Sequence, residues 1–322
     1  DPRDQQYGDQ FLHVFGKHTW DPLRHNDGDN DNQNSEKESS SMIGTLYDSK
    51  TSCGALLAKG IDNVYFYGDS YMRQVYAAVL ITLSGNYKNG SISNSDYAMS
   101  QGGADCQYRN QFNEKHCGIR QLNEDGKVCD GRIVLHHMQH GPYSIDTCRG
   151  RKVRSGVGGK AINIFSTGNH QLGGNRYGVN DAKAHAKLFT EEFCERLLRE
   201  EAKTVESGID VTNGCASFWV STHHRIIGWF PDEKGPVTQA FNEGMRLFFD
   251  SKLCGQQFHY IDVYNMTKSL VETFTLDATS EENKRKSMEV SYDYVHFGME
   301  VNLVKAQIII DGWVKSLPDV NV

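Results

Sequence analysis

The sequence predicts an α/β protein in which helices cover both faces of a parallel central sheet. Apolar and aromatic runs of strand length alternate with segments of helical periodicity along most of the chain. Polar residues capable of chemistry follow directly after several of the apolar runs. Because the carboxyl ends of parallel strands share one edge of a sheet, this order predicts a site at that edge.

The first strand and helix meet at a Gly-Asp-Ser turn. Residues 64–67 are apolar and aromatic and predict a buried strand, which is followed by Gly68, Asp69 and Ser70. A helix should begin there, because apolar residues recur at helical spacing: Met72, Val75, Tyr76, Val79, Leu80 and Leu83. Such a turn exposes the Ser70 hydroxyl and directs helix N-terminal amides at the group it attacks, which suits an acyl-transfer nucleophile. The alternative is an ordinary turn in which Asp69 or Ser70 caps the helix.

The remaining elements continue this alternation. Further apolar runs predict strands at 161–165, 216–221 and 258–263. Amphipathic segments predict helices at 181–205, 235–253 and 301–314. We expect the strands that end at Tyr67, Phe165 and Ser221 to be neighbours in one sheet.

Two segments are expected to decorate a single domain that spans residues 1–322. Residues 86–158 are rich in Gly, Asn and charged side chains, hold four cysteines and contain short β-like runs such as 133–135. We expect this segment to be a disulfide-tied insertion. Residues 1–45 should combine an apolar N-terminal arm with a mobile, acidic, low-complexity loop.

Two groups of residues contain side chains of the types that bind metal ions. Acidic residues of the N-terminal loop fall at ligand positions of a calcium-binding loop: Asp27, Asp29, Asp31 and Glu38. Asn32 replaces the glycine that such a loop requires, so a solvated loop is favoured. Histidines of the insertion are the other group: His136, His137 and His140. We favour exposed or substrate-facing histidines there, and expect neither a metal nor a bound cofactor.

The cysteines indicate the compartment. The chain has 8 cysteines, an even number, and no Cys-x-x-Cys pair. This pattern predicts four disulfides in a secretory-pathway protein, with reduced cysteines in a cytosolic protein as the alternative. Glycosylation sequons at Asn89 and Asn265 agree with the secretory route. The cysteines are Cys53, Cys106, Cys117, Cys129, Cys148, Cys194, Cys215 and Cys254.

Composition excludes two classes of partner. With 322 residues and 38% hydrophobic residues, the chain can bury a sizeable core. The net charge of −7 argues against nucleic acid, whose phosphates need a basic face. No apolar run approaches the length of a membrane span, so we expect no transmembrane segment in this chain. The chain begins Asp-Pro without Met, and we therefore expect a processed or trimmed form. We also expect a monomer.

A second motif lies near the other end of the chain. Residues 293–296 read Asp-Tyr-Val-His, and an Asp and a His three apart can orient and provide the base for a serine nucleophile. An early Gly-Asp-Ser-x-x-Arg, from Gly68 to Arg73, followed by a late Asp-x-x-His resembles the PC-esterase branch of the SGNH/GDSL hydrolase superfamily. This branch includes plant trichome-birefringence-like proteins, sialate O-acetyltransferases and neurexophilin-like esterase domains.

The resemblance covers residues 60–315 and includes two further stretches. Residues 165–170 are similar to the Gly-His-Trp stretch that follows a core strand in plant members. Residues 219–224 are similar to a family strand that ends in a Ser-Pro-x-His loop. The chain lacks the Trp pair after Gly168 and the proline near His224. The resemblance implies an SGNH-like three-layer sandwich. Because the chain lacks these family residues, the resemblance does not imply which acceptor is used.

The chemistry and the resemblance together assign roles at the site. We expect Ser70 to attack an acyl carbonyl, His296 to take its proton and Asp293 to orient the imidazole. The amides of Ser70 and Gly168 and the side chain of Asn169 are expected to hold the oxyanion. An ordinary turn residue is the alternative for Asn169.

Four more residues are candidates for substrate contact or support: Asp69, Arg73, His223 and His224. Arg73 would brace the site or meet an acyl donor, and the alternative is a structural ion pair, for example with Asp69. One of the two histidines would line the acceptor pocket, and the alternative is a satisfied core histidine.

These expectations describe a serine-dependent O-acyl transferase or esterase that acts on glycan hydroxyls, with O-acetyl transfer slightly favoured by the resemblance. The partner would be a polysaccharide or a glycoprotein glycan, and acetyl-CoA or an acetyl ester would serve as co-substrate. The location would be the secretory-pathway lumen, such as the Golgi, or the extracellular space. The alternative is a non-catalytic secreted glycan-binding domain that retains the fold.

Overall fold

The computed structural model describes eleven stretches of the chain, all within residues 48–319: 48–93, 105–113, 117, 122–123, 125–138, 160–167, 181–206, 215–224, 234–251, 258–273 and 296–319. A six-stranded sheet with the order β2-β3-β1-β4-β5-β6 forms its centre. Every neighbouring pair is parallel except β2 and β3. The strands are β1 (Ile61–Tyr67), β2 (Asp125–Val128), β3 (Ile133–Met138), β4 (Lys160–Phe165), β5 (Cys215–Val220) and β6 (Phe258–Ile261).

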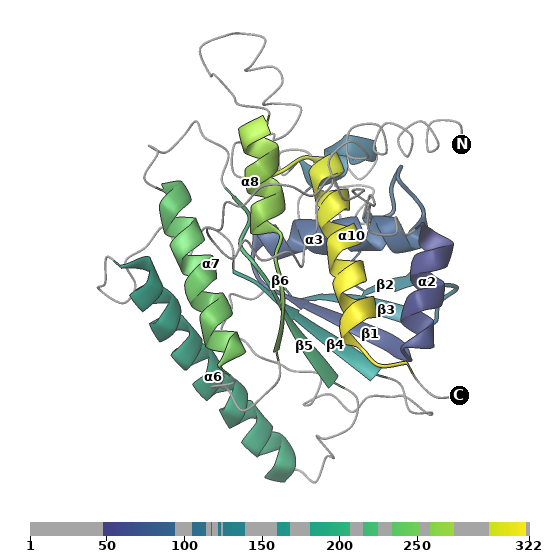
Figure 1. The fold of residues 1–322 in the computed structure, drawn as a ribbon. Coiled ribbons are helices and arrows are strands. Elements are labelled where there is room, and N and C mark those ends of the chain that lie inside the picture. Colours follow the sequence, from purple (N-terminus) through teal and green to yellow (C-terminus); the bar gives the residue numbers. More distant parts are fainter. Residues whose placement is uncertain are drawn as a thin grey trace, which may run out of the picture.

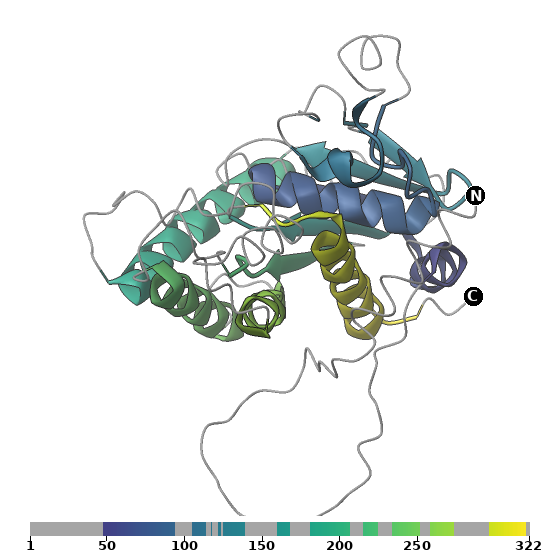
Figure 2. The ribbon, with the colours of Figure 1, turned by 90° about the horizontal axis from the view of Figure 1, so that it is seen from above.

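Helices cover both faces of this sheet (Figure 1). One face packs against α2, α3 and α10, and the other packs against α6 and α7. In Figure 2 the yellow α10 lies against the blue α3, in agreement with their contacts. The helices are α2 (Ser49–Ala58), α3 (Ser70–Ser84), α6 (Ala182–Glu206), α7 (Lys234–Asp250), α8 (Tyr264–Thr273) and α10 (Met299–Ser316), with a short 3₁₀ helix, η2 (Tyr108–Phe112).

Strand β1 lies inside the sheet, and its residues 64–67 are apolar or aromatic and buried on both faces. Val64 and Phe66 belong to the core under α3 and α10, whereas Tyr65 and Tyr67 belong to the core under α6 and α7. Successive strand residues point to opposite faces, so a run without polar alternation is buried between two helical layers. The predicted three-layer α/β architecture with a mostly parallel sheet is confirmed.

The strand order creates a switch point between β1 and β4. The chain builds the sheet outward from β1 to one side through β3, and then to the other side through β4, β5 and β6. The carboxyl ends of β1 and β4 are adjacent, with Tyr67 paired to Phe165. The strands predicted to end at Tyr67, Phe165 and Ser221 are neighbours, as expected. In open α/β sheets, ligands bind at such a switch point.

The segment predicted as an insertion contributes to the sheet itself. Strand β3 pairs with the central β1 along Asn63–Tyr67, and β2 pairs antiparallel to β3. Residues 86–158 are therefore more than a decoration of the fold. The difference arises because β3 ends in His-His-Met, so its sequence lacks the long apolar run of a central strand.

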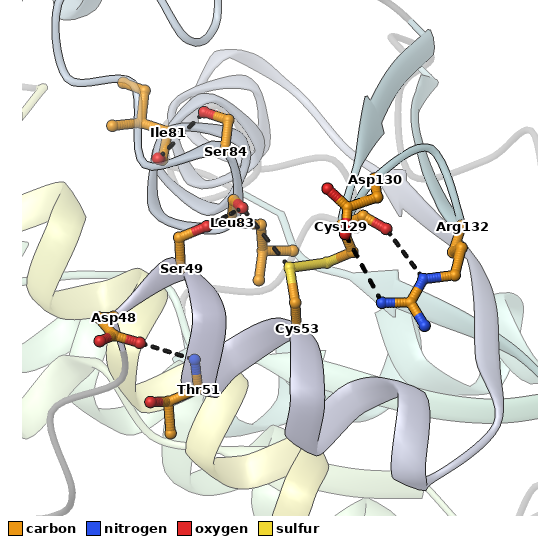
Figure 3. The surroundings of a disulfide bond; sticks show 10 residues. All are labelled: Asp48, Ser49, Thr51, Cys53, Ile81, Leu83, Ser84, Cys129, Asp130 and Arg132. Atoms are coloured by element: carbon orange, nitrogen blue, oxygen red, sulfur yellow. Dashed lines mark hydrogen bonds and ion pairs between the residues drawn. A yellow bond between two sulfur atoms is a disulfide. The ribbon is translucent and has the colours of Figure 1, made fainter.

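One disulfide ties this segment to the rest of the domain, and a second lies within the segment. Cys53 of α2 is bonded to Cys129 in the turn between β2 and β3 (Figure 3). Cys106 is bonded to Cys117. Cys194 is also disulfide-bonded, and none of the cysteines that the structure describes is free. The expected disulfide-tied segment is confirmed, whereas Cys148, Cys254 and the side chain of Cys215 lie outside the described residues and the total of four disulfides stays a prediction.

The described part of the chain contains no helix with the length and apolar character needed to cross a lipid bilayer. The N-terminal segment 1–45, with its predicted arm and loop, lies outside the described residues. The calcium-loop residues Asp27, Asp29, Asp31 and Glu38 fall in that segment.

Candidate active site

Ser70 and His296 lie side by side at the carboxyl edge of the sheet. The Ser70 Oγ atom is 2.9 Å from the His296 Nε2 atom, although the residues are 226 positions apart in sequence. Ser70 is the first residue of α3, and His296 lies just before α10, which packs against α3. Both side chains are half-buried, so neither is sealed from a ligand. The distance falls in the range expected for a serine and its general base.

Gly68 allows the chain to turn from β1 into α3 at this point. A Cβ atom at position 68 would lie 2.7 Å from the Ser166 carbonyl oxygen and 2.4 Å from Met72 Cγ. Real Cβ atoms do not approach other atoms this closely, so only glycine lets the turn pass the end of β4. The turn then places Ser70 directly above the end of β1.

Asp69 caps the helix that starts at Ser70. Its carboxylate accepts a hydrogen bond of 3.0 Å from the Tyr71 amide, and its carbonyl oxygen accepts one of 3.0 Å from the Arg73 amide. The capping alternative considered for this turn therefore holds for Asp69, and it coexists with the half-buried position of Ser70 beside His296. A capped N-terminus fixes the direction of the amides that begin the helix.

Serine and threonine hydroxyls join the carboxyl ends of the neighbouring strands. Ser166 Oγ donates to the Val220 carbonyl at 2.7 Å, and Thr222 Oγ1 donates to the Thr167 carbonyl at 2.6 Å. Ser221 Oγ accepts from the Val263 amide at 2.8 Å. These bonds connect the ends of β4, β5 and β6 along the edge that carries Ser70.

Tyr71 connects the start of α3 to this edge. Its hydroxyl donates to the Ser221 carbonyl at 2.9 Å. Burial, with a smaller effect from the Asp69 carboxylate, raises the pKa of Tyr71 well above its ordinary value. Tyr71 is therefore a neutral phenol and a permanent hydrogen-bond donor at physiological pH.

His223 and His224 are both buried. His223 is 1% exposed, and its ring meets Tyr71 and Phe297 edge to face at centroid distances of 4.7 and 5.0 Å. The His224 amide donates to Thr267 Oγ1 at 2.8 Å, and its side chain packs near Tyr264. The core-histidine alternative describes the position of His223, which lies behind the Ser70–His296 pair.

Arg73 lies one turn after Ser70 on α3 and is half-buried. It lines a small hollow with Gln74, Ser91, Gln111 and Phe112, between α3 and the disulfide-tied segment. Its predicted contact with an acyl donor stays a prediction.

Three predicted site residues, Asp293, Gly168 and Asn169, lie outside the described residues. The described strand end before Gly168 is Thr167, which is buried beside the Ser70 turn. The triad partner of His296 and two of the oxyanion donors therefore stay predictions.

His136 and His137, the insertion histidines that the structure describes, do not point toward a common site. His136 Nδ1 is 2.7 Å from Asp125 Oδ1, and its Nε2 is 3.1 Å from Asn63 Oδ1. His137 follows on β3 and so points to the opposite face, where its ring lies 5.4 Å from that of Tyr76. His140 lies outside the described residues, among which no cluster of metal-ligating side chains is found.

Sequence reasoning missed one buried polar group behind the pair. Lys305 and Asn302 lie on α10 and are both 0% exposed. A lysine and an asparagine on an amphipathic helix are typical of its solvent face, so the pattern gave no signal for their burial.

Comparisons with known proteins leave the family open. The sequence matches no family model. It matches no curated protein. Among solved structures, it is similar to the N-terminal part of protein BF1531 from Bacteroides fragilis, which contains a phosphatase domain complexed with Mg, with a TM-score of 0.36 and 12% identity. The match covers 82% of this chain and 56% of that chain, and so remote a similarity carries no inference about activity.

Proposed function

We propose that this chain is a serine-dependent O-acyl transferase or esterase of the PC-esterase type, acting on glycan hydroxyls through an acyl-serine intermediate. The observation that supports the proposal most directly is the 2.9 Å separation between Ser70 Oγ and His296 Nε2. Hydrogen-bonded contact between a serine at a helix N-terminus and a histidine is the arrangement of an activated nucleophile.

In the proposed reaction, Ser70 Oγ bonds to the carbonyl carbon of an ester or thioester while its proton passes to His296 Nε2. The bond to the leaving alcohol or thiol then breaks, and the leaving group takes that proton. In the second half, water or a sugar hydroxyl attacks the acyl carbon and gives its proton to His296. The bond between that carbon and Ser70 Oγ then breaks, and His296 returns the proton to Ser70 Oγ. Asp293 would hold the imidazole in place, and each oxyanion donor would contribute about 3–4 kcal/mol of transition-state stabilisation.

The start of α3 supports the oxyanion part of this proposal. The Ser70 amide lies at the N-terminus of a 15-residue helix, where partial positive charge is concentrated. We assign the remaining oxyanion donors to Gly168 and Asn169. An acetyl donor, either acetyl-CoA or an acetyl ester, would supply the acyl group, and a polysaccharide or glycoprotein glycan would receive it.

The disulfides support a location in the secretory-pathway lumen or outside the cell. Cys53–Cys129 joins α2 to the turn between β2 and β3, Cys106–Cys117 joins two cysteines 11 residues apart, and such bonds persist in oxidising compartments. Glycan acceptors are found in the same compartments.

The test measures acetate release from p-nitrophenyl acetate by the wild-type chain, with and without sugar acceptors, together with labelling of Ser70 by a fluorophosphonate probe. Mass spectrometry of a glycan panel incubated with an acetyl donor separates transfer from hydrolysis. The Ser70→Ala variant should lose turnover and labelling. Ser84→Ala, at the opposite and exposed end of α3, is the matched control and should keep both.

Absence of turnover and of labelling in the wild-type chain would contradict the proposal. In that case, glycan binding without chemistry would support the non-catalytic binding domain instead. Equal turnover by the wild-type and Ser70→Ala chains would contradict the acyl-serine intermediate.

A further inference from the structure

Lys305 lies in the core directly behind the Ser70–His296 pair. Its side chain is 0% exposed. Its Nζ atom is 3.1 Å from His223 Nδ1 and 3.1 Å from Asn302 Oδ1. Lys305 therefore links α10 to the residues that follow the end of β5.

Two aromatic rings enclose the same amine. Nζ lies 5.1 Å from the centroid of the Tyr71 ring and 4.5 Å from that of the Phe297 ring. Tyr71 directly follows Ser70, and Phe297 directly follows His296. The lysine consequently contacts the chain neighbour of each member of the pair.

Asn302 extends the contact to the backbone that carries His296. Its Nδ2 atom donates to the Phe297 carbonyl at 2.7 Å and to the Gly298 carbonyl at 3.0 Å. Those carbonyls belong to the two residues that follow His296. Lys305 Nζ donates to the Oδ1 atom of the same amide, and this hydrogen bond fixes the orientation of the amide group.

The environment of Lys305 is costly for a charged group. Burial lowers the pKa of Lys305 well below its ordinary value. Among the described residues, its polar partners are the uncharged Asn302 amide and the His223 imidazole, and no carboxylate pairs with it. The titratable groups that face it are His223 from the end of β5 and Tyr71 from α3. An apolar residue would fill this space at a lower free-energy cost. The presence of a lysine here is therefore best explained by the hydrogen bonds that its amine makes.

We propose that Lys305 is a positioning residue, which holds His223 and Asn302 so that the segments carrying Ser70 and His296 meet at hydrogen-bonding distance. This inference rests on the proposed function for its effect on activity, but its structural part does not. The proposed role requires a donor at the position of Nζ, since both Asn302 Oδ1 and an unprotonated His223 Nδ1 accept.

The first test is the kinetics of Lys305→Met, which keeps an unbranched side chain of similar bulk and removes the donor. We expect kcat for p-nitrophenyl acetate to fall about 10- to 100-fold, because small displacements of catalytic groups have effects of this size. KM should stay within about twofold, because Lys305 is sealed from the substrate. Ile309→Ala, a buried change on the same helix, is the control for lost packing and should leave kcat within about twofold once the protein is folded.

The second test does not need activity. Histidine ring ¹⁵N signals, assigned with His223→Gln and His296→Gln variants, report tautomer and hydrogen bonding. Lys305→Met should change the ring signals of His223 and His296, and Ile309→Ala should change neither.

The outcomes separate the two proposals. If the wild-type chain is inactive and unlabelled, the proposed function fails and the ring signals alone decide the role of Lys305. Unchanged His223 and His296 signals in Lys305→Met would overturn the positioning role in either case. An active wild-type chain with full kcat in Lys305→Met would overturn it as well, and would leave the proposed function intact.

Discussion

Gly68 and Ser166 approach each other so closely that a methyl group on Gly68 would lie 2.7 Å from the Ser166 carbonyl oxygen. Gly68 comes from the end of β1 and Ser166 from the end of β4, the two strands at the switch point of the sheet. The contact sets the height of Ser70 above the sheet edge.

Gly68→Ala should therefore destabilise the protein by about 1–3 kcal/mol, because the clash is with backbone and cannot be relieved by a rotamer change. Activity should fall further than stability alone explains, because the turn that carries Ser70 must shift. Urea unfolding and ester turnover measure the two effects. Gly54→Ala is the control: Gly54 is exposed on α2 with nothing within 4 Å of an added Cβ, and the change should stabilise by about 0.5–1 kcal/mol. A neutral Gly68→Ala would contradict this account of the turn.

Asp69→Ala should cost about 1 kcal/mol of stability, because the Tyr71 amide loses its acceptor at the start of α3. Asp69→Asn retains an acceptor oxygen and should keep most of that stability. Comparing the stability of the two variants by thermal unfolding separates the contribution of the cap from that of the negative charge. A loss as large in Asp69→Asn as in Asp69→Ala would show that the charge, rather than the cap, stabilises the helix.

Ser70→Ala and His296→Ala should each remove nearly all acyl turnover without unfolding the protein. Since the serine and the histidine are expected to act as one unit, the double variant should be scarcely worse than either single variant. Asp293→Asn should leave somewhat more activity, because the imidazole keeps its place but loses its charge partner. Steady-state rates and circular dichroism check these outcomes. Additive losses in the double variant would indicate that the two side chains act separately.

The disulfide Cys53–Cys129 should stabilise the fold more than Cys106–Cys117. Cys53 and Cys129 are separated by 76 positions in the sequence, whereas Cys106 and Cys117 are separated by 11. Longer loops lose more entropy when the unfolded chain is cross-linked, so the two effects should differ by about 1–2 kcal/mol within a range of roughly 2–4 kcal/mol. Double Cys→Ala variants of each pair, compared by urea unfolding, test the order. Equal losses would indicate that the enthalpy of each site, and not loop length, dominates.

The stability difference between the wild-type chain and Lys305→Met should depend on pH. Burial lowers the folded-state pKa of Lys305 below its ordinary value of 10.5, so between these two values the unfolded chain holds a proton that the folded chain has released. Stability therefore rises with pH in that window, and only in the wild-type chain. We expect urea unfolding to show that the free energy of unfolding of the wild-type chain, relative to that of Lys305→Met, is larger at about pH 9 than at about pH 7. A constant difference would contradict the lowered pKa.

The sequence predicted the central strand and the helix after it because both contain recognisable apolar patterns. Residues 64–67 of β1 are apolar or aromatic, apolar residues recur at helical spacing along α3, and Gly68-Asp69-Ser70 marks the turn between them. β3 was harder to recognise, because Ile133–Met138 alternates buried with half-buried residues and contains two histidines. Helix α2 was missed because its polar and apolar residues show little helical separation, and the disulfide at Cys53 helps to hold it.

The site could be predicted in part for a similar reason. Ser70 and His296 stand in short motifs that a sequence displays directly, and their order along the chain suggested the pairing. Lys305 has no such motif. Its burial depends on Tyr71, His223 and Phe297, which come from three separate segments and meet only in the folded protein. Tertiary contacts of this kind leave no periodic trace in a single sequence.

The position of α10 has a consequence for how the protein is made. The last strand of the sheet ends at Ile261, before His296 in the chain, and α10 then packs back onto α3. On a ribosome, Ser70 therefore emerges 226 residues before its imidazole neighbour. The nascent chain can complete all the strands that the structure describes while the serine still lacks that neighbour. Docking of α10 is the step that brings the two side chains together, so a chain cut after α8 would keep those strands and lose the pair.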